Sequence, residues 1–374
     1  MQAQEGMIRA AAERARRFCE RLEIEIPLLS APMSGVSTPE LAAAFSCAGG
    51  LGVLAADLLE PEDIEREVRR VRAITDRPFA VNLRIPPRDR GDRAQALKVI
   101  YALGELRREL GLPEQVDLDA FREPDFDRQL EALLDCGVKA ACCSFGGYRE
   151  AYEERLHAAG VFILGAATTL REAKVQRSAR ADAVILQGAE AGGPRLYFES
   201  EPQESSVGLS VLLAGAGRAV NLPLVASGGI STPAGAVAAL VAGASAVMVG
   251  TAVACSPESA VPDLMKRSMI AASDTATCLS DQLSGRLERV MKNGLIEALK
   301  RAGVASSGYP WQRFIMHDLM ERAAQLGRAD LLRMPVGQGA DVFCCRKASE
   351  TVRILGQALR EFMSGQSAGP AKEQ

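Results

Sequence analysis

A loop with three glycines and one carboxylate is the part of this sequence best suited to hold a ligand. It spans residues 187–195, reads Gln-Gly-Ala-Glu-Ala-Gly-Gly-Pro-Arg, and follows the short apolar run 183–186. Glycine lets the backbone approach a flat ligand closely and adopt positive φ angles. Glu190 adds a carboxylate to the same turn. The pattern predicts a ligand-binding loop at the end of a buried strand.

Two further glycine-bearing turns follow. Gly228 and Gly229 come after one apolar run, and Gly250 with Thr251 comes after the next. Backbone N–H groups at such turns and at helix N-termini bind phosphate. The alternative is that these glycines only make tight turns. Because two adjacent loops share the pattern and Thr251 adds a hydroxyl, we favour a phosphate site. No Gly-x-x-x-x-Gly-Lys-Ser/Thr motif supports nucleotide hydrolysis.

Three apolar runs end in side chains that suit the edge or the face of a flat ring. Asn82 and Gln187 carry amides, which both donate and accept hydrogen bonds. Either amide contacts a ligand or braces its own loop. Met33 lies against a flat ring or fills the core.

Eight short apolar segments must position these loops, and helical patterns alternate with them. They are apolar throughout, as in parallel sheets covered on both faces. Eight strand–helix units predict a closed (β/α)8 barrel, a TIM barrel, with its functional loops at the C-terminal ends of the strands. A doubly wound open sheet is the rival, but its glycine-rich turn follows the first strand. Here the glycine loops follow the last three strands, which favours the barrel. The predicted strands are Ile26–Met33, Leu51–Ala55, Phe79–Leu83, Val138–Cys143, Val161–Gly165, Ala183–Leu186, Leu224–Ser227 and Ala246–Val249.

The chain divides around this barrel. We predict a barrel over residues 1–257 that binds the ligand, with a charged insertion at 86–127 after the third strand. That insertion holds one helical pattern, near residues 95–110. Residues 258–330 read as a wholly helical cap without strand candidates. Residues 331–363 return to the barrel, and 364–374 form a small, polar, disordered tail. The first twenty residues form one amphipathic helix, for the barrel bottom or for contacts in a homodimer.

Bulk composition excludes several classes of function. A net charge of −3 and a pI near 5.7 give no electrostatic footprint for nucleic acid. Nine cysteines include no Cys-x-x-Cys pair and accompany only two histidines, so we predict no metal site. No signal-peptide pattern begins the chain, and no apolar run reaches the roughly 18 residues of a membrane span. We therefore expect a cytoplasmic protein with reduced thiols.

The ordered motifs resemble the nitronate monooxygenase (2-nitropropane dioxygenase) family of FMN-dependent barrel enzymes. They also resemble its relatives, the flavin-dependent enoyl-acyl-carrier-protein reductases. The match runs in order over about residues 25–255, with a weaker match in the tail. Any one of these motifs is weak evidence for the resemblance, whereas the ordered set is strong evidence. The matching segments are residues 31–41, 48–52, 78–83, 188–193, 226–230, 249–252 and 336–339.

This resemblance implies a cofactor and a reaction. The cofactor is FMN, and the reaction is oxidation of an alkyl nitronate by O2 to a carbonyl compound and nitrite. In that chemistry the cofactor carries out the redox step while the protein orients the substrate. The implied phosphate ligands are Gly228, Gly229, Gly250 and Thr251, and the implied ring contacts are Ala31, Pro32, Met33 and Asn82, with Gln187, Gly192 and Gly193 nearby.

One position departs from the family pattern. The Glu-Ala-Gly-Gly segment of the family is followed by a histidine, taken as the base that deprotonates a neutral nitroalkane, and here that position is Pro194. Proline cannot transfer a proton, so the base is moved or absent. An already anionic nitronate needs no base. We therefore expect an anionic substrate.

No catalytic residue is assigned from the sequence. Glu190, Arg195 and His317 are candidates, and His157 reads as a surface or packing residue. Arg195 and Arg84 bind an anionic group of the substrate, or they are structural ion pairs or charges that face the solvent. Other polar side chains expected near the barrel mouth or in the cap are Cys143, Ser144, Tyr197, Lys292 and Tyr309.

Two other functions stay open. One keeps the flavin and uses NAD(P)H to reduce a quinone, an enoyl thioester or a biosynthetic intermediate. The other is a barrel that binds a flavin or a phosphate ligand without catalysis, for sensing or for support of a partner.

Overall fold

The computed structural model describes residues 2–87, 90–339 and 345–365. Eight parallel strands form one sheet in the order β1-β9-β8-β6-β5-β4-β3-β2, and a parallel bridge between Leu29 and Leu51 joins its two edges. The predicted (β/α)8 barrel is therefore confirmed. Each predicted strand is present: β1 (Leu28–Ser30), β2 (Gly52–Ala55), β3 (Phe79–Arg84), β4 (Ala140–Ser144), β5 (Phe162–Ala167), β6 (Ala183–Gln187), β8 (Leu224–Ser227) and β9 (Ala246–Val249).

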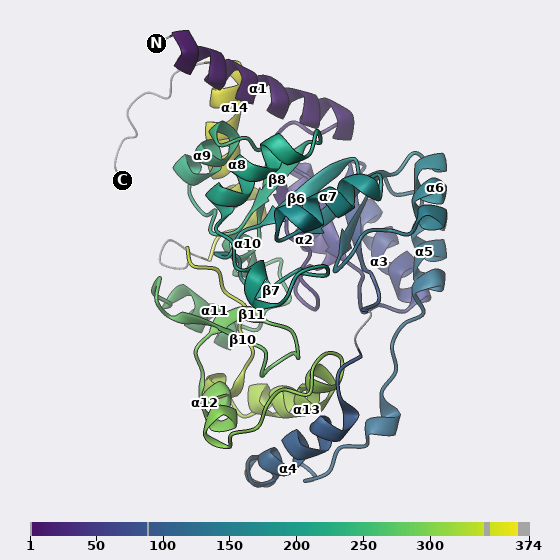
Figure 1. Ribbon diagram of the computed structural model, residues 1–374, viewed down its shortest axis with the longest axis vertical. Coiled ribbons are helices and arrows are strands. Elements are labelled where there is room, and N and C mark those ends of the chain that lie inside the picture. Colours follow the sequence, from purple (N-terminus) through teal and green to yellow (C-terminus); the bar gives the residue numbers. More distant parts are fainter. Residues whose placement is uncertain (1, 88–89, 340–344, 366–374) are drawn as a thin grey trace.

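Helices surround this barrel (Figure 1). Three of them begin at threonines whose hydroxyls accept a backbone N–H bond, at 3.0 Å for Thr38, 3.2 Å for Thr169 and 3.1 Å for Thr232. The place between α9 and α2 is taken by the late helix α14 (Ala348–Ser364), which packs against both. The other outer helices are α2 (Pro39–Cys47), α3 (Pro61–Ile74), α5 (Phe126–Asp135), α6 (Glu150–Ala158), α7 (Leu170–Ser178), α8 (Leu209–Ala219) and α9 (Pro233–Val241).

Alternate strand residues fill the barrel interior. Ala80 and Ile185 belong to one buried cluster inside the ring of strands. Because side chains alternate along a strand, the residues two positions further on point the same way. Asn82 therefore continues the inward series of β3, and Gln187 that of β6. The sheet places these two amides at the C-terminal mouth of the barrel.

The opposite end of the barrel is covered by α1 (Gln2–Leu22). Phe18 and Leu22 join the cluster inside the barrel, and the Phe18 ring meets the Phe162 ring edge-on with centroids 6.2 Å apart. Figure 1 shows α1 beside α14, at the far end of the molecule from α4, α12 and α13. The amphipathic face of α1 thus packs on the barrel bottom, one of the two roles that its pattern allowed.

A second lobe lies over the mouth. Residues 258–330 are mostly helical, but the prediction that they contain no strand is wrong. Strand β11 pairs with β10 on one side and, on the other, with β7, a two-residue strand in the 187–195 loop, as an antiparallel sheet. These strands are short and partly polar, so no apolar run marks them. The short helix α10 (Thr251–Ala254) leads from β9 toward this lobe. The elements of the sheet and lobe are β7 (Gly193–Pro194), α11 (Asp263–Ile270), β10 (Thr277–Ser280), β11 (Glu288–Met291), α12 (Gly294–Arg301), α13 (Trp311–Gln325) and the 3-10 turn η3 (Ala329–Leu331).

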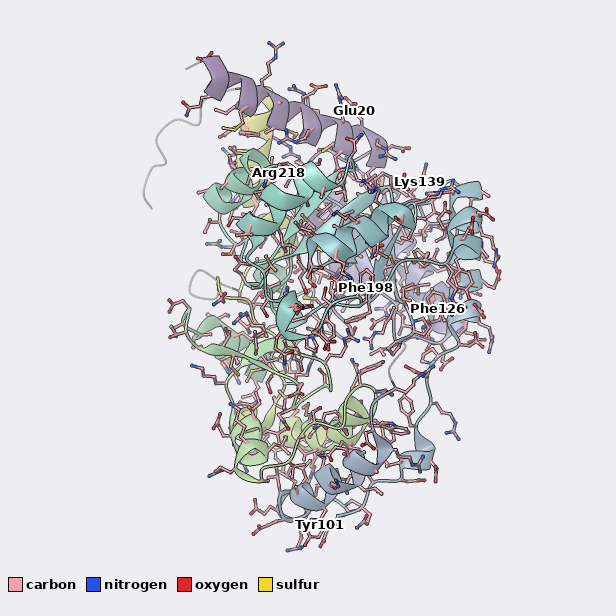
Figure 2. All side chains as sticks on the ribbon, viewed as in Figure 1. Glu20, Tyr101, Phe126, Lys139, Phe198 and Arg218 are labelled. Carbon is pink, nitrogen blue, oxygen red and sulfur yellow. The ribbon has the colours of Figure 1, made fainter. Side chains whose placement is uncertain are left out.

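The insertion after β3 packs against this lobe. Its helix α4 (Arg93–Glu109) lies on α13, and Ile100 and Leu103 share one hydrophobic cluster with the cap. The buried guanidinium of Arg107 donates to both carboxylate oxygens of Asp318, at 2.8 and 2.6 Å. Insertion and cap therefore share one core, although they are far apart in the sequence. Figure 2 labels Tyr101 of α4 at the tip of this lobe, far from Glu20 of α1.

Two short 3-10 turns, η1 (Leu118–Ala120) and η2 (Gln203–Ser205), lie in connecting segments. Across the described ranges, no helix is both long enough and apolar enough to cross a bilayer. The predicted tail at 364–374 lies outside the described residues beyond Gly365.

Candidate functional site

Backbone N–H groups without acceptors gather at the ends of β8 and β9. Gly228 and Gly229 have φ angles of +127° and +67°, which only glycine adopts readily. The N–H groups of Gly229, Ile230 and Gly250 donate to no acceptor within the described chain. No side chain projects from the three glycines, and Thr251 follows directly. We name residues 228–230, 250 and 251 the phosphate corner, because they have the donors and the open backbone that a phosphate needs.

A segment from the C-terminal part of the chain joins the two glycine loops. The N–H of Gly337 donates to Thr251 Oγ1 at 3.1 Å, and the N–H of Gln338 donates to the carbonyl of Glu190 at 2.9 Å. A Cβ atom at Gly192 would lie 2.7 Å from the nitrogen of Gly337, so only glycine permits this approach. Segment 336–339 therefore fixes the 187–195 loop beside the phosphate corner.

Glu190 stabilises the start of a helix. Both of its carboxylate oxygens lie 3.1 Å from the N–H of Leu209, the first residue of α8. A carboxylate at this place satisfies a free helix donor and opposes the positive end of the helix dipole. The position ties the loop to α8 and gives Glu190 a structural role.

Arg195 has no exposed surface, and its guanidinium holds the same loop from within. It donates to the carbonyls of Gly188 at 2.7 Å, Gln187 at 2.8 Å and Ser205 at 2.6 Å. Burial lowers its pKa to about 10. The Gln187 amide acts similarly: it donates to the Pro194 carbonyl and accepts from the N–H of Leu196, both at 3.0 Å. For Gln187 the geometry favours the loop-bracing alternative. Arg195 also braces the loop, a role that the sequence did not suggest, and it forms no ion pair with a described residue.

We expect Arg195→Met to destabilise the protein strongly. Methionine fills part of the space but leaves three carbonyls without their donor, and each buried unsatisfied group costs about 1–3 kcal/mol. The free energy of unfolding in urea should fall by at least about 3 kcal/mol. Arg177→Met is the matched control, because exposed Arg177 donates to a single carbonyl, that of Ala219. Equal stability of the two variants would contradict the bracing role.

The segment after β1 lies beside the phosphate corner. The N–H of Ala31 donates to the carbonyl of Val249 at 2.8 Å. A Cβ atom on Gly250 would lie 3.5 Å from the Ala31 Cβ and 3.9 Å from the Met33 sulfur. Pro32 connects the two. Residues 31–33 are partly exposed and form one wall of the mouth next to Gly250.

Asn82 lies on the other side of the mouth. In the eight-strand ring its strand, β3, is four strands from β8, the strand that carries the glycine pair. Asn82 is 5% exposed, and its amide makes no hydrogen bond to any residue in the described ranges. The little surface that the amide keeps is open to the mouth, so its donor and acceptor are available to a ligand. This free amide fits a ligand that reaches across the mouth from the phosphate corner.

Arg84 forms an ion pair at the rim. Its guanidinium lies 2.5 Å from an oxygen of Asp57, and the Ser34 hydroxyl donates to that carboxylate at 2.7 Å. Burial opposes the charge of Arg84, but Asp57 and the nearby Tyr309 raise its pKa. Of the roles that the sequence allowed for Arg84, the structure shows the ion pair, and this pair lies at the mouth.

The other polar residues that the sequence suggested lie partly at the rim of the mouth and partly in the protein core. Burial raises the pKa of the Cys143 thiol to about 12, which makes it a poor nucleophile. The Ser144 hydroxyl donates to the Leu83 carbonyl at 3.4 Å, and Lys292 is exposed. The backbone carbonyl of Tyr197 accepts from Arg286 at 2.6 Å, and the Tyr309 ring lies under Arg84.

Neither histidine of the chain replaces the one that the family resemblance places at position 194. His157 lies at the N-terminal end of the barrel, where Nε2 is 3.0 Å from an Asp182 oxygen and Nδ1 pairs with Glu153. It borders a hollow of about 310 Å³ under α1. His317 is exposed on α13 and makes no hydrogen bond or ion pair with the described part of the chain.

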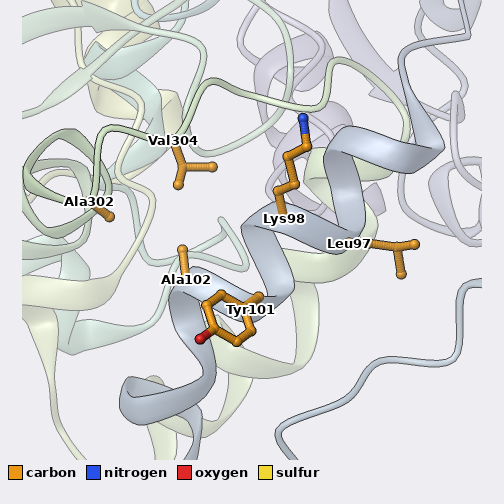
Figure 3. A pocket seen from close by; sticks show the side chains of 6 residues that line it. All are labelled: Leu97, Lys98, Tyr101, Ala102, Ala302 and Val304. Atoms are coloured by element: carbon orange, nitrogen blue, oxygen red, sulfur yellow. The ribbon is translucent and has the colours of Figure 1, made fainter.

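A second hollow, of about 550 Å³, lies between α4 and the segment after α12 (Figure 3). Its walls are mainly apolar, and Tyr101 at its edge is 89% exposed. It lies on the insertion side of the cap, away from the barrel mouth. No cluster of acids or bases among its described lining residues marks it as a catalytic site. The residues that line it are Leu97, Lys98, Tyr101, Ala102, Ala302 and Val304.

Three residues at the mouth escape prediction from the sequence. Asp57 follows β2, Phe145 follows β4 with a φ of +65°, and Arg286 precedes β11. Each comes from a different segment, and the chain contains many arginines paired with acids. No local pattern marks them, since only the tertiary fold brings them together.

The fold and the site define a (β/α)8 barrel with a corner of free backbone N–H groups and a free amide across its mouth. The nitronate monooxygenase family model matches residues 16–351. A probable nitronate monooxygenase of Staphylococcus aureus is 32% identical over 348 residues, which cover 93% of this chain and 98% of the relative. The chain therefore belongs to the nitronate monooxygenase family.

Solved structures agree with this assignment. A nitroalkane oxidase from Streptomyces ansochromogenes superposes with a TM-score of 0.85 at 33% identity, covering 91% of this chain and 98% of that one. FabK from Thermotoga maritima superposes with a TM-score of 0.72 at 26% identity, covering 93% and 97%. Family membership supports an oxidoreductase with a flavin cofactor, and the site fits such a group on its own observations.

Proposed function

We propose that this protein is an FMN-dependent oxidoreductase that oxidises alkyl nitronates with O2 to a carbonyl compound and nitrite. The observation that carries the proposal is the pairing of the phosphate corner with the free Asn82 amide across the mouth. FMN has a phosphate at one end and a polar-edged ring at the other. The comparisons support the class of reaction, and the geometry supports the cofactor.

The residues of this chain bind and orient the reactants. The N–H groups of Gly229, Ile230 and Gly250 would hold the phosphate, and Asn82 would meet the edge of the ring. Residues 31–33 would form the wall against which the ring lies. When bound, the flavin supplies the transfer of electrons from substrate to oxygen. The protein contributes a fixed geometry, braced by Arg195 and segment 336–339, and a small-molecule site beneath the cap.

The test begins with the visible spectrum. The purified protein should be yellow, with roughly one FMN per chain released on heating. Under air it should convert ethylnitronate to acetaldehyde and nitrite, and its activity on neutral nitroethane should be far lower, because Pro194 supplies no base. A colourless protein that binds no added FMN would contradict the cofactor. Bound FMN without nitrite release would contradict the reaction.

A second candidate is the reduction of an acceptor by NAD(P)H. The likeness to FabK and the proline at the base position favour it. Anaerobic mixing with NADH and with NADPH separates the two functions, since a reductase bleaches its flavin absorbance at once. If neither a nitronate nor a reduced nicotinamide reacts, a barrel that binds flavin without catalysis remains.

A further inference from the structure

The outer face of helix α4 exposes two large, mainly apolar side chains. Tyr101 is 89% exposed and Leu97 is 55% exposed. They are four residues apart, so they lie on the same face of the helix. The inner face of α4, with Ile100 and Leu103, is buried in the core that the insertion shares with the cap. The two exposed side chains therefore project from a helix whose other side is firmly packed.

The hollow of about 550 Å³ lies directly beside this face. Ala102 lines it from α4, and Ala302 and Val304 line it from the segment after α12 (Figure 3). The hollow thus offers mainly apolar walls next to the projecting ring of Tyr101. Such a surface is self-complementary, because the ring of one copy can fill the hollow of another. Tyrosine is also one of the residue types that most often anchor protein interfaces.

Two charges on the same face have no partner within the described chain. Lys98 and Glu105 are exposed, and neither forms a hydrogen bond or an ion pair with a described residue. By contrast, Arg108 on the next turn pairs with Glu114 at 2.8 Å. Lys98 and Glu105 are seven residues apart, which is about two helical turns, with Tyr101 between them. The face thus carries a free positive charge on one side of its aromatic ring and a free negative charge on the other.

We propose that this face of α4 is a homodimer interface, in which two copies of the chain meet with their α4 helices antiparallel about a two-fold axis. An axis between positions 101 and 102 places Lys98 opposite the partner's Glu105, and symmetry repeats this pair. Tyr101 then lies beside the partner's Ala102, at the partner's hollow. The charges select the antiparallel direction, because a parallel pair would set Lys98 against the partner's Lys98.

The position and the size of this face determine what kind of dimer to expect. Tyr101 lies at the tip of the lobe, and the hollow lies away from the barrel mouth (Figure 2). Helix α4 has 17 residues, which gives a face roughly 25 Å long. One helix face is at the small end of specific interfaces, so we expect a Kd of about 1–100 µM. The interface does not depend on the proposed function.

Sedimentation velocity of the full-length protein measures this association. The native protein should pass from monomer to dimer as its concentration rises through about 1–100 µM. Tyr101→Arg should stay monomeric, because it would place a charge in each apolar hollow. Val211→Arg is the matched control, since Val211 is 64% exposed on α8 of the barrel, far from α4 (Figure 1). This control should dimerise as the native protein does.

Charge exchange tests the antiparallel arrangement. Lys98→Glu alone and Glu105→Lys alone each set like charges opposite one another at two places, so each should raise Kd by about tenfold or more. The double variant restores opposite charges and should dimerise with the native Kd. An equimolar mixture of the two single variants should form a heterodimer for the same reason. Lys174→Glu is the charge control, because exposed Lys174 on α7 makes no ion pair with a described residue.

A native protein that stays monomeric throughout the concentration range would overturn the interface. A dimer that Tyr101→Arg leaves intact would do so too, since another surface would then hold it together. Single charge variants that the double exchange fails to rescue would overturn the antiparallel arrangement. Every substituted side chain is exposed, so thermal unfolding midpoints should stay within about 2 °C of the native value. Equal midpoints would show that lost association is not a result of unfolding.

Discussion

Replacement of Gly229 by valine is expected to abolish flavin binding. Gly229 has a φ of +67°, and a Cβ atom there would lie 3.0 Å from the Glu190 Cβ. A β-branched residue is strongly disfavoured at this angle. The turn must therefore change shape, and the N–H groups of Gly229 and Ile230 would leave the phosphate corner. The purified variant should be colourless, with flavin absorbance below about a tenth of the native value, as expected when the phosphate loses its backbone donors.

The control for this variant is Gly303→Val. Gly303 lies after α12 in the cap and has a φ of +64°, and a Cβ atom there would have no neighbour within 4 Å. It carries the same backbone penalty far from the corner. If both variants are destabilised but only Gly229→Val loses flavin, the corner holds the cofactor. A yellow Gly229→Val protein with native FMN content would refute the site.

Replacement of Pro194 by histidine is expected to create activity on neutral nitroalkanes. Pro194 occupies the position at which the family resemblance places a base, and it lies in β7 opposite Glu288 of β11. A positioned general base contributes about 10²–10⁴-fold to proton transfer. We therefore expect nitrite release from nitroethane to rise by at least about 100-fold. The new activity should increase with pH through the range near about 6.5 where a histidine loses its proton.

Pro194→Ala separates the base from the loss of the proline ring. It removes the constraint on φ but supplies no proton acceptor, so its activity on nitroethane should stay at the native level. Turnover of the preformed nitronate should change little in either variant. Equal gains in both variants, or no gain with histidine, would show that the position does not face the reacting carbon.

Local patterns in the sequence predict the barrel well. Each strand is a short apolar run, and the caps at Thr38, Thr169 and Thr232 are signals carried within four residues. Such features depend little on the rest of the chain. The glycine turns are predictable for the same reason, because a positive φ at Gly228 and Gly229 needs glycine in any context.

The cap and the substrate side of the site are not predictable in this way. Strand β11 pairs with β7, which lies far earlier in the chain and has only two residues. The partners of Arg195 are backbone carbonyls. Because every residue type has such a carbonyl, the sequence does not show which ones accept these bonds. Arg84 and Arg286 both contact the Phe145 ring although they come from distant segments, and that is a property of the tertiary structure.

The position of α14 affects how the protein is made. This helix fills the gap between α2 and α9, so the ring of outer helices stays incomplete until α14 has left the ribosome. Segment 336–339, which joins the glycine loops, emerges only shortly before it. During synthesis, the earlier strands must wait with an apolar flank uncovered, a state that exposes a growing chain to aggregation. Chaperone demand and expression yield should therefore respond to α14 more than to helices nearer the N-terminus.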